Sequence, residues 1–481
     1  MKAAKVSVAQ AEAYYYDRDA VYSQSESRYL GTGAAALGIE GQGIGEEFSL
    51  LIRGFSPEGE KLAQKKNLSD DKAVAGTDIP LTLPKSFSVL ALADPELRAA
   101  ALEAAKATVA AVEANGWIEG RQTVDGVTER VQGKMVAAVF PHSTSRENDA
   151  HFHVHSVFMN MAQRPDGTWS TLENHSLLQH SKEIRQIFLS EFAASEAVQK
   201  YGLDLWVDRG GTVIPEAAGF TPEIIDLFSK RQSEIHNASA LRERLQEKMP
   251  HLAPEKIETL IQLSTRSAKN KDMTEADLIK SHREQLATAG LPSLEQLRDN
   301  AIAMKAEQSA EKLTTAEIVK QAAEDLSEHQ SVFSRAELLQ AALKQSVGHA
   351  APGDVEKAIL ESAAKSNLVS YGNDKFTTPE IHRIEGQVAS VAVEQREAFS
   401  PLLSDREVKL AVEAFQEKKG FTLTRGQAEA VGYVLQAPWP DRRDPGGRRR
   451  GQILINGSGC GRHQGHRRRA RGSSSRVYVA R

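Results

Sequence analysis

Hydrophobic and polar residues alternate in four short segments: "KVSV" at 5–8, "DIPLTL" at 78–83, "MVAAVF" at 135–140 and "FHVHSVFM" at 152–159. Alternation with a period of two is typical of strands that bury one face. The segment 94–116, "DPELRAAALEAAKATVAAVEANG", has instead the composition of a helix, with Asp94 at the position of an N-cap. The pattern predicts an α+β fold in which strands and helices are mixed from the start.

The rest of the chain is mainly helical in pattern. "RPDGTWS" at 164–170 predicts a turn before a short strand, because Pro and Gly supply preset and positive φ values. Residues 176–201 predict one long amphipathic helix, and 215–320 are mostly helical and charged. From 329 to about 395, two predicted helices precede the hairpin signal "LVSYGNDKFTT", which indicates a small winged-helix-like module.

Composition narrows the class of protein. The 481 residues suffice for two or three domains, and no apolar run approaches the roughly 18 residues of a membrane helix. The N-terminus turns polar too early for a signal peptide, so we expect a cytoplasmic protein without membrane insertion. Because Cys460 is the single cysteine, a metal site must use His and carboxylate ligands.

Charge is distributed unevenly along the chain. Residues 441–481 contain twelve Arg and two Asp, a balance of +10, so the net charge of −4 leaves −14 for the first 440 residues. Nucleic-acid binding by the first 440 residues would therefore need a local basic surface. The Arg-, Gly- and Ser-rich end lacks hydrophobic periodicity, and we expect it to be disordered.

Histidines gather on the strand predicted at 152–159 and beside it. His151, His153 and His155 share one face of a strand, while Phe152 and Val154 face the other side. His142 ends the preceding apolar strand, and an antiparallel return would place it beside this set. A metal site and a solvent-facing or structurally satisfied histidine pair are both compatible with such a pattern, and the clustering favours the metal.

Tyrosines form a second cluster, at 14–16 and 22. A helix cannot bury three consecutive side chains on one face, so at least one of Tyr14, Tyr15 and Tyr16 must point elsewhere. A tyrosine hydroxyl can be a nucleophile, but with a pKa of about 10 it needs help from a cation or a base. Asp78 at the start of a strand could supply that help, although a strand-entry cap is an equally good reason for its presence.

These motifs resemble a known family in order and spacing. "YYYDRDAVY", "GTDIPLTLPKS", "HSTSREND", "HFHVHSVFMN" and "DGTWSTL" are similar to the MobF group (TrwC-like) of conjugative relaxases, members of the HUH endonucleases. The resemblance implies an antiparallel-sheet core flanked by helices, then the winged-helix-like module and an incomplete helicase start. The expected parts are a relaxase domain at 1–300, a linker module at 301–400, the truncated start of a superfamily 1 helicase-like domain at 401–455, and an Arg-rich tail at 456–481.

The resemblance also implies roles for individual residues. Tyr14 matches the primary nucleophile, Tyr15 is its neighbour, and Tyr22 fits the second tyrosine group, where Val21 replaces one tyrosine of the usual pair. The three metal ligands fall on His142, His153 and His155, the active-site aspartate falls on Asp78, and His151 becomes an extra ligand or a residue behind the ligands. Pro80 lacks a ladder donor inside its strand, which predicts a local sheet edge or bulge.

The helicase likeness stops at the phosphate-binding loop. "INGSGCGRHQGH" supplies glycines, but Arg462 and His463 stand where Lys and Ser or Thr are expected. We therefore expect no ATP-driven activity, and we attribute the Arg-rich end to a truncation or a shifted reading frame.

The implied function is metal-dependent nicking of single-stranded or hairpin DNA at a transfer origin, through a 5'-phosphotyrosyl intermediate that can be resealed. The family uses one divalent ion, Mg²⁺ or Mn²⁺ in turnover, whereas three imidazoles favour Zn²⁺ or Ni²⁺ by affinity. Accessory relaxosome proteins and the coupling protein of a secretion system are the implied partners in a bacterial cytoplasm. Alternatives are a noncatalytic DNA-binding remnant and a zinc hydrolase. Candidate DNA-binding residues are Arg28, Lys85, Arg146, Arg185, Lys269 and Lys271.

Overall fold

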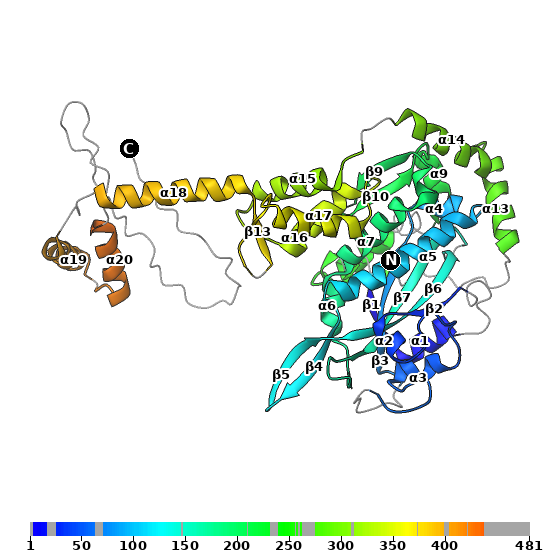
Figure 1. Cartoon of the computed structure of the whole chain (residues 1–481), viewed down its shortest axis with the longest axis horizontal. Helices are drawn as coiled ribbons and strands as arrows, with labels where there is room; N and C mark the ends of the chain where they lie inside the picture. Colours follow the sequence, from blue (N-terminus) through cyan, green and yellow to red (C-terminus); the bar gives the residue numbers. More distant parts are fainter. Residues whose placement is uncertain are drawn as a thin grey trace. The chain divides into compact units, whose positions relative to one another are not determined.

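The computed structural model describes the chain in segments: residues 3–16, 26–62, 71–145, 148–208, 210–230, 239–254, 256–257, 260–261, 275–308, 312–372, 374–398, 404–420 and 422–436. Two compact units are present, Met1–Pro379 and Glu380–Arg481 (Figure 1). Within the described helices, none is long and apolar enough to cross a membrane.

The first unit is built on a six-stranded sheet with the order β1-β3-β7-β6-β2, in which β8 also pairs with β7. Every pairing is antiparallel. The expected antiparallel core is therefore confirmed, and the four predicted strands are β1, β3, β6 and β7. The strands are β1 Ala4–Ser7, β2 Arg28–Leu30, β3 Val74–Thr82, β6 Lys134–Thr144, β7 Ala150–Gln163 and β8 Trp169–Ser170.

Strand β7 separates two hydrophobic cores. Phe152, Val154 and Phe158 belong to the larger core, together with residues of α4 Lys85–Leu90, α5 Pro95–Ala114 and α7 Ser181–Ala194. Successive side chains of a strand face opposite sides, so Val157 and Met159 belong to the smaller core. That core contains residues of α1 Val8–Ala11, the π-helix η1 Glu12–Tyr16, α2 Thr32–Ala36 and α3 Glu47–Arg53.

Helix α5 begins where the sequence predicts. Asp94 is the N-cap and accepts a hydrogen bond from the backbone N–H of Glu96, while Pro95 occupies the first helical position. The helix then buries its Ala- and Val-rich face in the larger core.

The single long helix expected at 176–201 is wrong. The segment forms α6 Asn174–Gln179, α7 and α8 Glu196–Gln199. His180 leaves helical geometry (φ −93°, ψ 15°) and stacks on Trp117 with ring centroids 4.6 Å apart, and Ser195 is extended. Packing of the His180 ring thus overrides the continuous helical periodicity.

Pro80 lies at a local sheet edge, as its missing donor predicts. Among the described residues, which begin at residue 3, β1 pairs with β3 as far as Ala4 opposite Asp78, whereas β7 continues along β3 to Thr82. Beyond Asp78, the described ladder partner of β3 is β7 alone. A proline, which has no backbone N–H to donate, is tolerated at such an edge position.

Smaller elements surround this core. Strands β4 Glu119–Val124 and β5 Val127–Gln132 form a two-stranded ribbon whose residues are mostly exposed (Figure 1). The remaining elements of the expected 1–300 region are β9 Leu203–Val207, β10 Val213–Ala217, α9 Pro222–Leu227, α11 Ser239–Lys248, α13 Glu275–Thr288 and α14 Leu294–Glu307.

The winged-helix-like module has three helices and a three-stranded sheet with the order β11-β13-β12. Its elements are α15 Thr315–Ser327, β11 Phe333–Ser334, α16 Arg335–Ser346, α17 Pro352–Ala364, β12 Val369–Ser370 and β13 Lys375–Thr377. The expected domain boundaries at 300 and 400 stay predictions.

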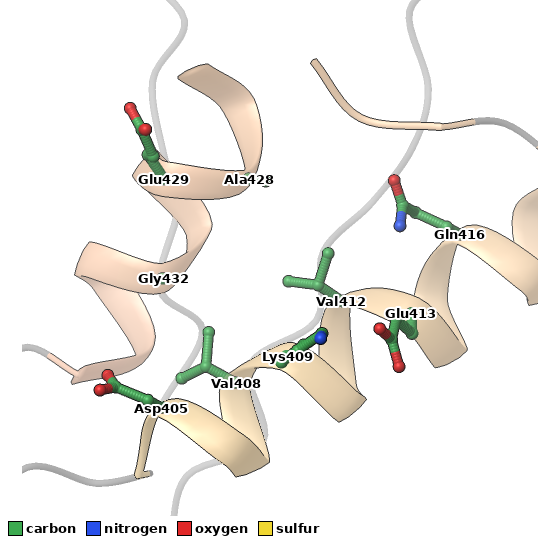
Figure 2. A pocket seen from close by; sticks show the side chains of 9 residues that line it. All are labelled: Asp405, Val408, Lys409, Val412, Glu413, Gln416, Ala428, Glu429 and Gly432. Atoms are coloured by element: carbon green, nitrogen blue, oxygen red, sulfur yellow. The ribbon is translucent and has the colours of Figure 1, made fainter. Parts of the chain in front are cut away.

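Helix α18 Pro379–Ala398 opens the second unit, which also contains α19 Asp405–Lys419 and α20 Arg425–Gln436. Figure 2 shows a pocket between α19 and α20, where Val408 and Val412 face Ala428 and Gly432. Its lining is mostly aliphatic and carboxylate side chains, and nothing in it indicates a ligand. The helicase-like start at 401–455 stays a prediction, and the expected tail at 456–481, with Arg462 and His463, lies outside the described residues.

Candidate functional site

Three histidines converge where β6 and β7 pair. His142 on β6 lies directly opposite His153 on β7, and His155 is two residues further along the same face. The ligand atoms of His142, His153 and His155 all lie within 4.8 Å of one another. His153 and His155 are buried. The antiparallel return predicted from the sequence is therefore confirmed.

Hydrogen bonds set the tautomers of two of these rings. The Nδ1 atom of His153 lies 2.8 Å from the carbonyl oxygen of His151. The Nδ1 atom of His155 lies 2.8 Å from Oδ2 of Asp78. Both partners are acceptors, so each Nδ1 carries the proton and each Nε2 presents its lone pair, as metal-ligating histidines require.

Burial favours the neutral form of His153 and of the neighbouring His151. Burial and the neighbouring histidines hold the pKa of His153 well below its usual value. Burial and the nearby Lys85 ammonium lower the pKa of His151 to about 3. Neutral imidazole is the form that binds metals, and the three clustered ligand atoms of His142, His153 and His155 fit a divalent ion.

Asp78 connects the histidines to the tyrosine segment, which is the π-helix η1 Glu12–Tyr16. It lies opposite Val157, diagonal to His155, and its Oδ2 accepts hydrogen bonds from His155 and from the hydroxyl of Tyr15, each at 2.8 Å. The Tyr15 ring stacks on Phe140 at 4.9 Å and meets the His155 ring edge-on at 5.4 Å. A phenol, a carboxylate and a candidate metal ligand thus form one buried chain.

Glu12, the first residue of η1, ties this π-helix to α3. Its carboxylate accepts a hydrogen bond from the Ser49 hydroxyl and forms an ion pair with Arg53 at 3.1 Å, and both partners belong to α3. Tyr14 belongs to η1, but its side chain and the whole of Tyr22 lie outside the described residues. The roles expected for Tyr14 and Tyr22 stay predictions.

The expected DNA-binding residues have different surroundings. Arg28 on β2 donates to the Ser27 carbonyl. Lys85 donates to the Ala150 carbonyl at 2.8 Å, and burial lowers its pKa. Arg185 pairs with Asp208 at 2.7 Å. Arg146, Lys269 and Lys271 lie outside the described residues.

His151 stands beside the three converging histidines. Its ring lies 4.9 Å from that of His153, but within the described part of the chain it is not one of the three residues whose ligand atoms cluster. Its carbonyl orients His153, so its observed contribution comes from the backbone.

Glu216 is a residue of this site that local sequence pattern does not reveal. Its carboxylate accepts from the backbone N–H groups of Lys85 and Ser86 and from the Ser86 hydroxyl, at the N-terminus of α4. This contact fixes the start of α4 beside β7. The two segments are 130 residues apart in the chain, and local pattern carries no information on such a pairing.

Known proteins are similar to this chain over its N-terminal part. The family model described as TrwC relaxase matches residues 3–289 of this chain. Two multifunctional conjugation proteins TraI of Escherichia coli, the second from strain K12, are 35% and 34% identical to it over 166 residues. The match spans 34% of this chain but only 9% of each relative.

Solved structures show the same fold. The conjugative relaxase TrwC in complex with oriT DNA, in metal-free and metal-bound forms, is 25% and 26% identical, with TM-scores of 0.51 and 0.52. A copper-bound form has a TM-score of 0.52 at 25% identity. Each comparison covers 60% of this chain and 99% of the other. With a family match over more than half of its residues, this chain belongs to the TrwC relaxase family.

Proposed function

We propose that this chain is a DNA relaxase that nicks one strand at a transfer origin and holds the cut strand through a phosphotyrosyl bond. The observation that carries the proposal is the buried chain from Tyr15 through Asp78 and His155 to the three converging histidines. The oriT DNA bound in the TrwC structures supports a DNA substrate of the same kind.

In the proposed reaction, the hydroxyl oxygen of Tyr14 attacks the phosphorus of the scissile phosphodiester. A bond forms from this oxygen to phosphorus, and the bond from phosphorus to the 3' oxygen breaks. The phenol proton leaves through a carboxylate such as Asp78, and the departing 3' oxygen takes a proton from solvent. The phosphodiester energy is kept in the new bond, so the reverse attack reseals the strand without ATP.

The protein residues have separate tasks in this scheme. His142, His153 and His155 would hold one divalent ion, which when bound neutralises charge developing on the phosphate. Asp78 keeps His155 in its ligand tautomer and holds the Tyr15 hydroxyl. Tyr22 is proposed to assist a second transfer, as the resemblance implies.

The ion is proposed to be Mg²⁺ or Mn²⁺ in turnover. Three imidazoles alone bind Zn²⁺, Ni²⁺ or Cu²⁺ more tightly, in accordance with the copper-bound TrwC structure. Oxygen atoms of the bound phosphate would complete the coordination of the harder ions, which three nitrogen ligands do not satisfy.

The β4–β5 ribbon is a proposed contact for the duplex arm of an origin hairpin. A two-stranded ribbon fits the major groove of duplex DNA, and Arg121 and Arg130 are largely exposed on it. Arg28, Lys85, Arg146, Arg185, Lys269 and Lys271 stay proposed contacts to the single strand. Accessory relaxosome proteins and a coupling protein also stay predictions from the resemblance.

The test is formation of a covalent adduct. The chain is incubated with 5'- and 3'-labelled strands carrying the candidate origin, with Mn²⁺ or with EDTA, and adducts are resolved on denaturing gels. We expect a metal-dependent adduct on the strand 3' of the nick that Tyr14→Phe abolishes and Tyr15→Phe reduces.

Other outcomes identify the alternatives. Metal-dependent cleavage that persists in Tyr14→Phe, Tyr15→Phe and Tyr22→Phe without an adduct would indicate a hydrolase that uses bound water. Specific origin binding without cleavage in any divalent metal would indicate a binding remnant. Either result would contradict the proposed transesterification.

A further inference from the structure

Three basic side chains from different parts of the fold contact three successive residues where the turn between β6 and β7 ends and β7 begins. The contacts are His282 Nε2 to the Asn148 carbonyl at 2.9 Å, Lys230 Nζ to Asp149 Oδ1 at 3.7 Å, and Lys85 Nζ to the Ala150 carbonyl at 2.8 Å. His282 lies on α13, Lys230 follows α9, and Lys85 begins α4. Elements distant in sequence therefore meet at one short turn.

This turn joins the two strands that carry the histidines. His142 lies two residues before the end of β6, and β7 begins at Ala150, three residues before His153. The β6–β7 register shifts between His142 and Thr144, and Asn148 has a left-handed φ of 56°. Such a backbone has a conformational cost and persists only where its surroundings hold it. The turn therefore lies directly beyond the paired His142 and His153, at the irregular end of the ladder.

His282 is placed to hold this shape. Its side chain is completely buried, with its ring edge-on to Phe228 at a centroid distance of 5.2 Å. Because the Asn148 carbonyl can only accept, Nε2 carries the ring proton. Burial lowers the pKa of His282 to about 4, so at neutral pH the ring is uncharged and Nδ1 has no proton. Among the described residues, Nδ1 has no hydrogen-bond partner, so the bond to Asn148 is the polar contact that distinguishes His282 from an apolar residue.

Helix α13 is tied to the same turn a second time. Lys230 donates to Oε1 of Gln285 on α13 at 3.0 Å while it pairs with the buried Asp149. His282 and Gln285 are three residues apart, so they lie on one face of the helix. That face of α13 therefore packs toward the turn that connects the ligand strands.

We propose that His282 is a positioning residue for the metal site: its hydrogen bond to the Asn148 carbonyl fixes the β6–β7 turn and thereby the spacing of His142 and His153. The proposal rests on the proposed function, because it requires that the three histidines bind an ion. A displaced turn would move one ligand relative to the other two, which weakens binding and changes the coordination geometry.

Cobalt binding to the full chain tests this proposal, because the visible absorption of Co²⁺ reports both affinity and geometry. His282→Leu keeps an apolar side chain but removes the donor, whereas His282→Gln places an amide N–H near the position of Nε2. We expect His282→Leu to weaken Co²⁺ binding about tenfold and to alter the absorption bands, and His282→Gln to restore both to within about twofold. The matched control is His349→Leu, in which the lost histidine accepts a backbone hydrogen bond from Leu313 in the winged-helix-like module.

The outcomes separate this inference from the function on which it rests. If the unaltered chain binds no Co²⁺, the metal site itself is refuted. If it does, and His282→Leu binds with unchanged affinity and spectrum, the positioning role is refuted. Equal losses in the Leu and Gln variants, with far-UV circular dichroism unchanged, would assign the effect to packing and also overturn the proposal. If His282→Leu does not fold, Lys230→Met decides: its side chain is 47% exposed, we expect about threefold weaker binding, and unchanged binding overturns the proposal.

Discussion

Asp78→Asn is the most informative single change, because Asp78 Oδ2 accepts from both Tyr15 and His155. The amide has nearly the same shape, so the substitution removes charge while it leaves little cavity. A hydrogen bond to a charged group contributes about 1.5–3 kcal/mol, and a neutral one about 0.5–1.5 kcal/mol. The loss for two bonds is therefore about 2–3 kcal/mol.

This loss divides between two measurable quantities. Part of it destabilises the metal-free fold, and part appears as weaker metal binding, because His155 loses the group that sets its tautomer. If half of the loss appears in binding, the affinity for Mn²⁺ falls about tenfold, since 1.4 kcal/mol corresponds to a factor of ten. Removal of a proton acceptor beside the tyrosines should slow adduct formation about a hundredfold further, even with saturating metal.

The assay measures adduct formation against Mn²⁺ concentration for the unaltered chain and for Asp78→Asn. The matched control is Asp166→Asn, an aspartate in the turn before β8 that hydrogen-bonds Thr168. An Asp78→Asn chain with unchanged Mn²⁺ dependence and an adduct rate within twofold of the unaltered chain would refute the assigned role of Asp78.

Three further predictions follow from the structure. Mn²⁺ at about one hundred times its dissociation constant should stabilise the fold by about 2.7 kcal/mol, measured by thermal unfolding. His153→Ala should remove this stabilisation. An equal stabilisation in His153→Ala would place the ion elsewhere. Arg130→Ala, on strand β5 of the ribbon, should weaken binding of a hairpin oligonucleotide, measured by fluorescence anisotropy. The slope of log binding constant against log salt concentration should become smaller by about one, while nicking of an unstructured strand stays unchanged. Loss of both hairpin binding and nicking would contradict a contact limited to the duplex arm. Burial and the nearby Asp354 and Glu356 raise the pKa of Glu191 to about 7, so the folded chain binds a proton that the unfolded chain releases near pH 4.5. The stability that this group contributes is fully present below pH 4.5 and is lost as the pH rises through about 7, a change of about 1–2 kcal/mol after solvent screening. Thermal unfolding of Glu191→Gln from pH 5 to 8 should lack this loss of stability. A pH profile identical to that of the unaltered chain would contradict the assignment.

Local pattern predicts those parts of this site that depend on periodicity. The alternation around His153 fixes which side chains share a face, and the short turn after His142 implies an antiparallel return, so a cluster of histidines follows from one stretch of sequence. The choice of three of them as ligands, without His151, came from the family resemblance. The helix at 94–116 follows from composition and its N-cap. In each case the information lies within a few residues of the feature.

The contacts that orient the site are not predictable in this way. Tyr15 meets Asp78 across 63 residues of chain, and His282 meets Asn148 across 134. Both contacts depend on how whole elements pack, which the periodicity of one element does not encode. The break at His180 has the same origin, because its ring stacks on Trp117 from another part of the fold.

The central position of β7 has a consequence for folding fidelity. One face carries apolar side chains toward α5 and α7, whereas the other carries the histidines together with apolar side chains such as Val157 and Met159. A slip of one residue against β3 or β6 would exchange these faces, burying imidazoles among aliphatic side chains and dispersing the ligand set. A mispaired sheet would therefore lack the three-histidine cluster, so the register of β7 against β3 and β6 decides whether the site forms at all.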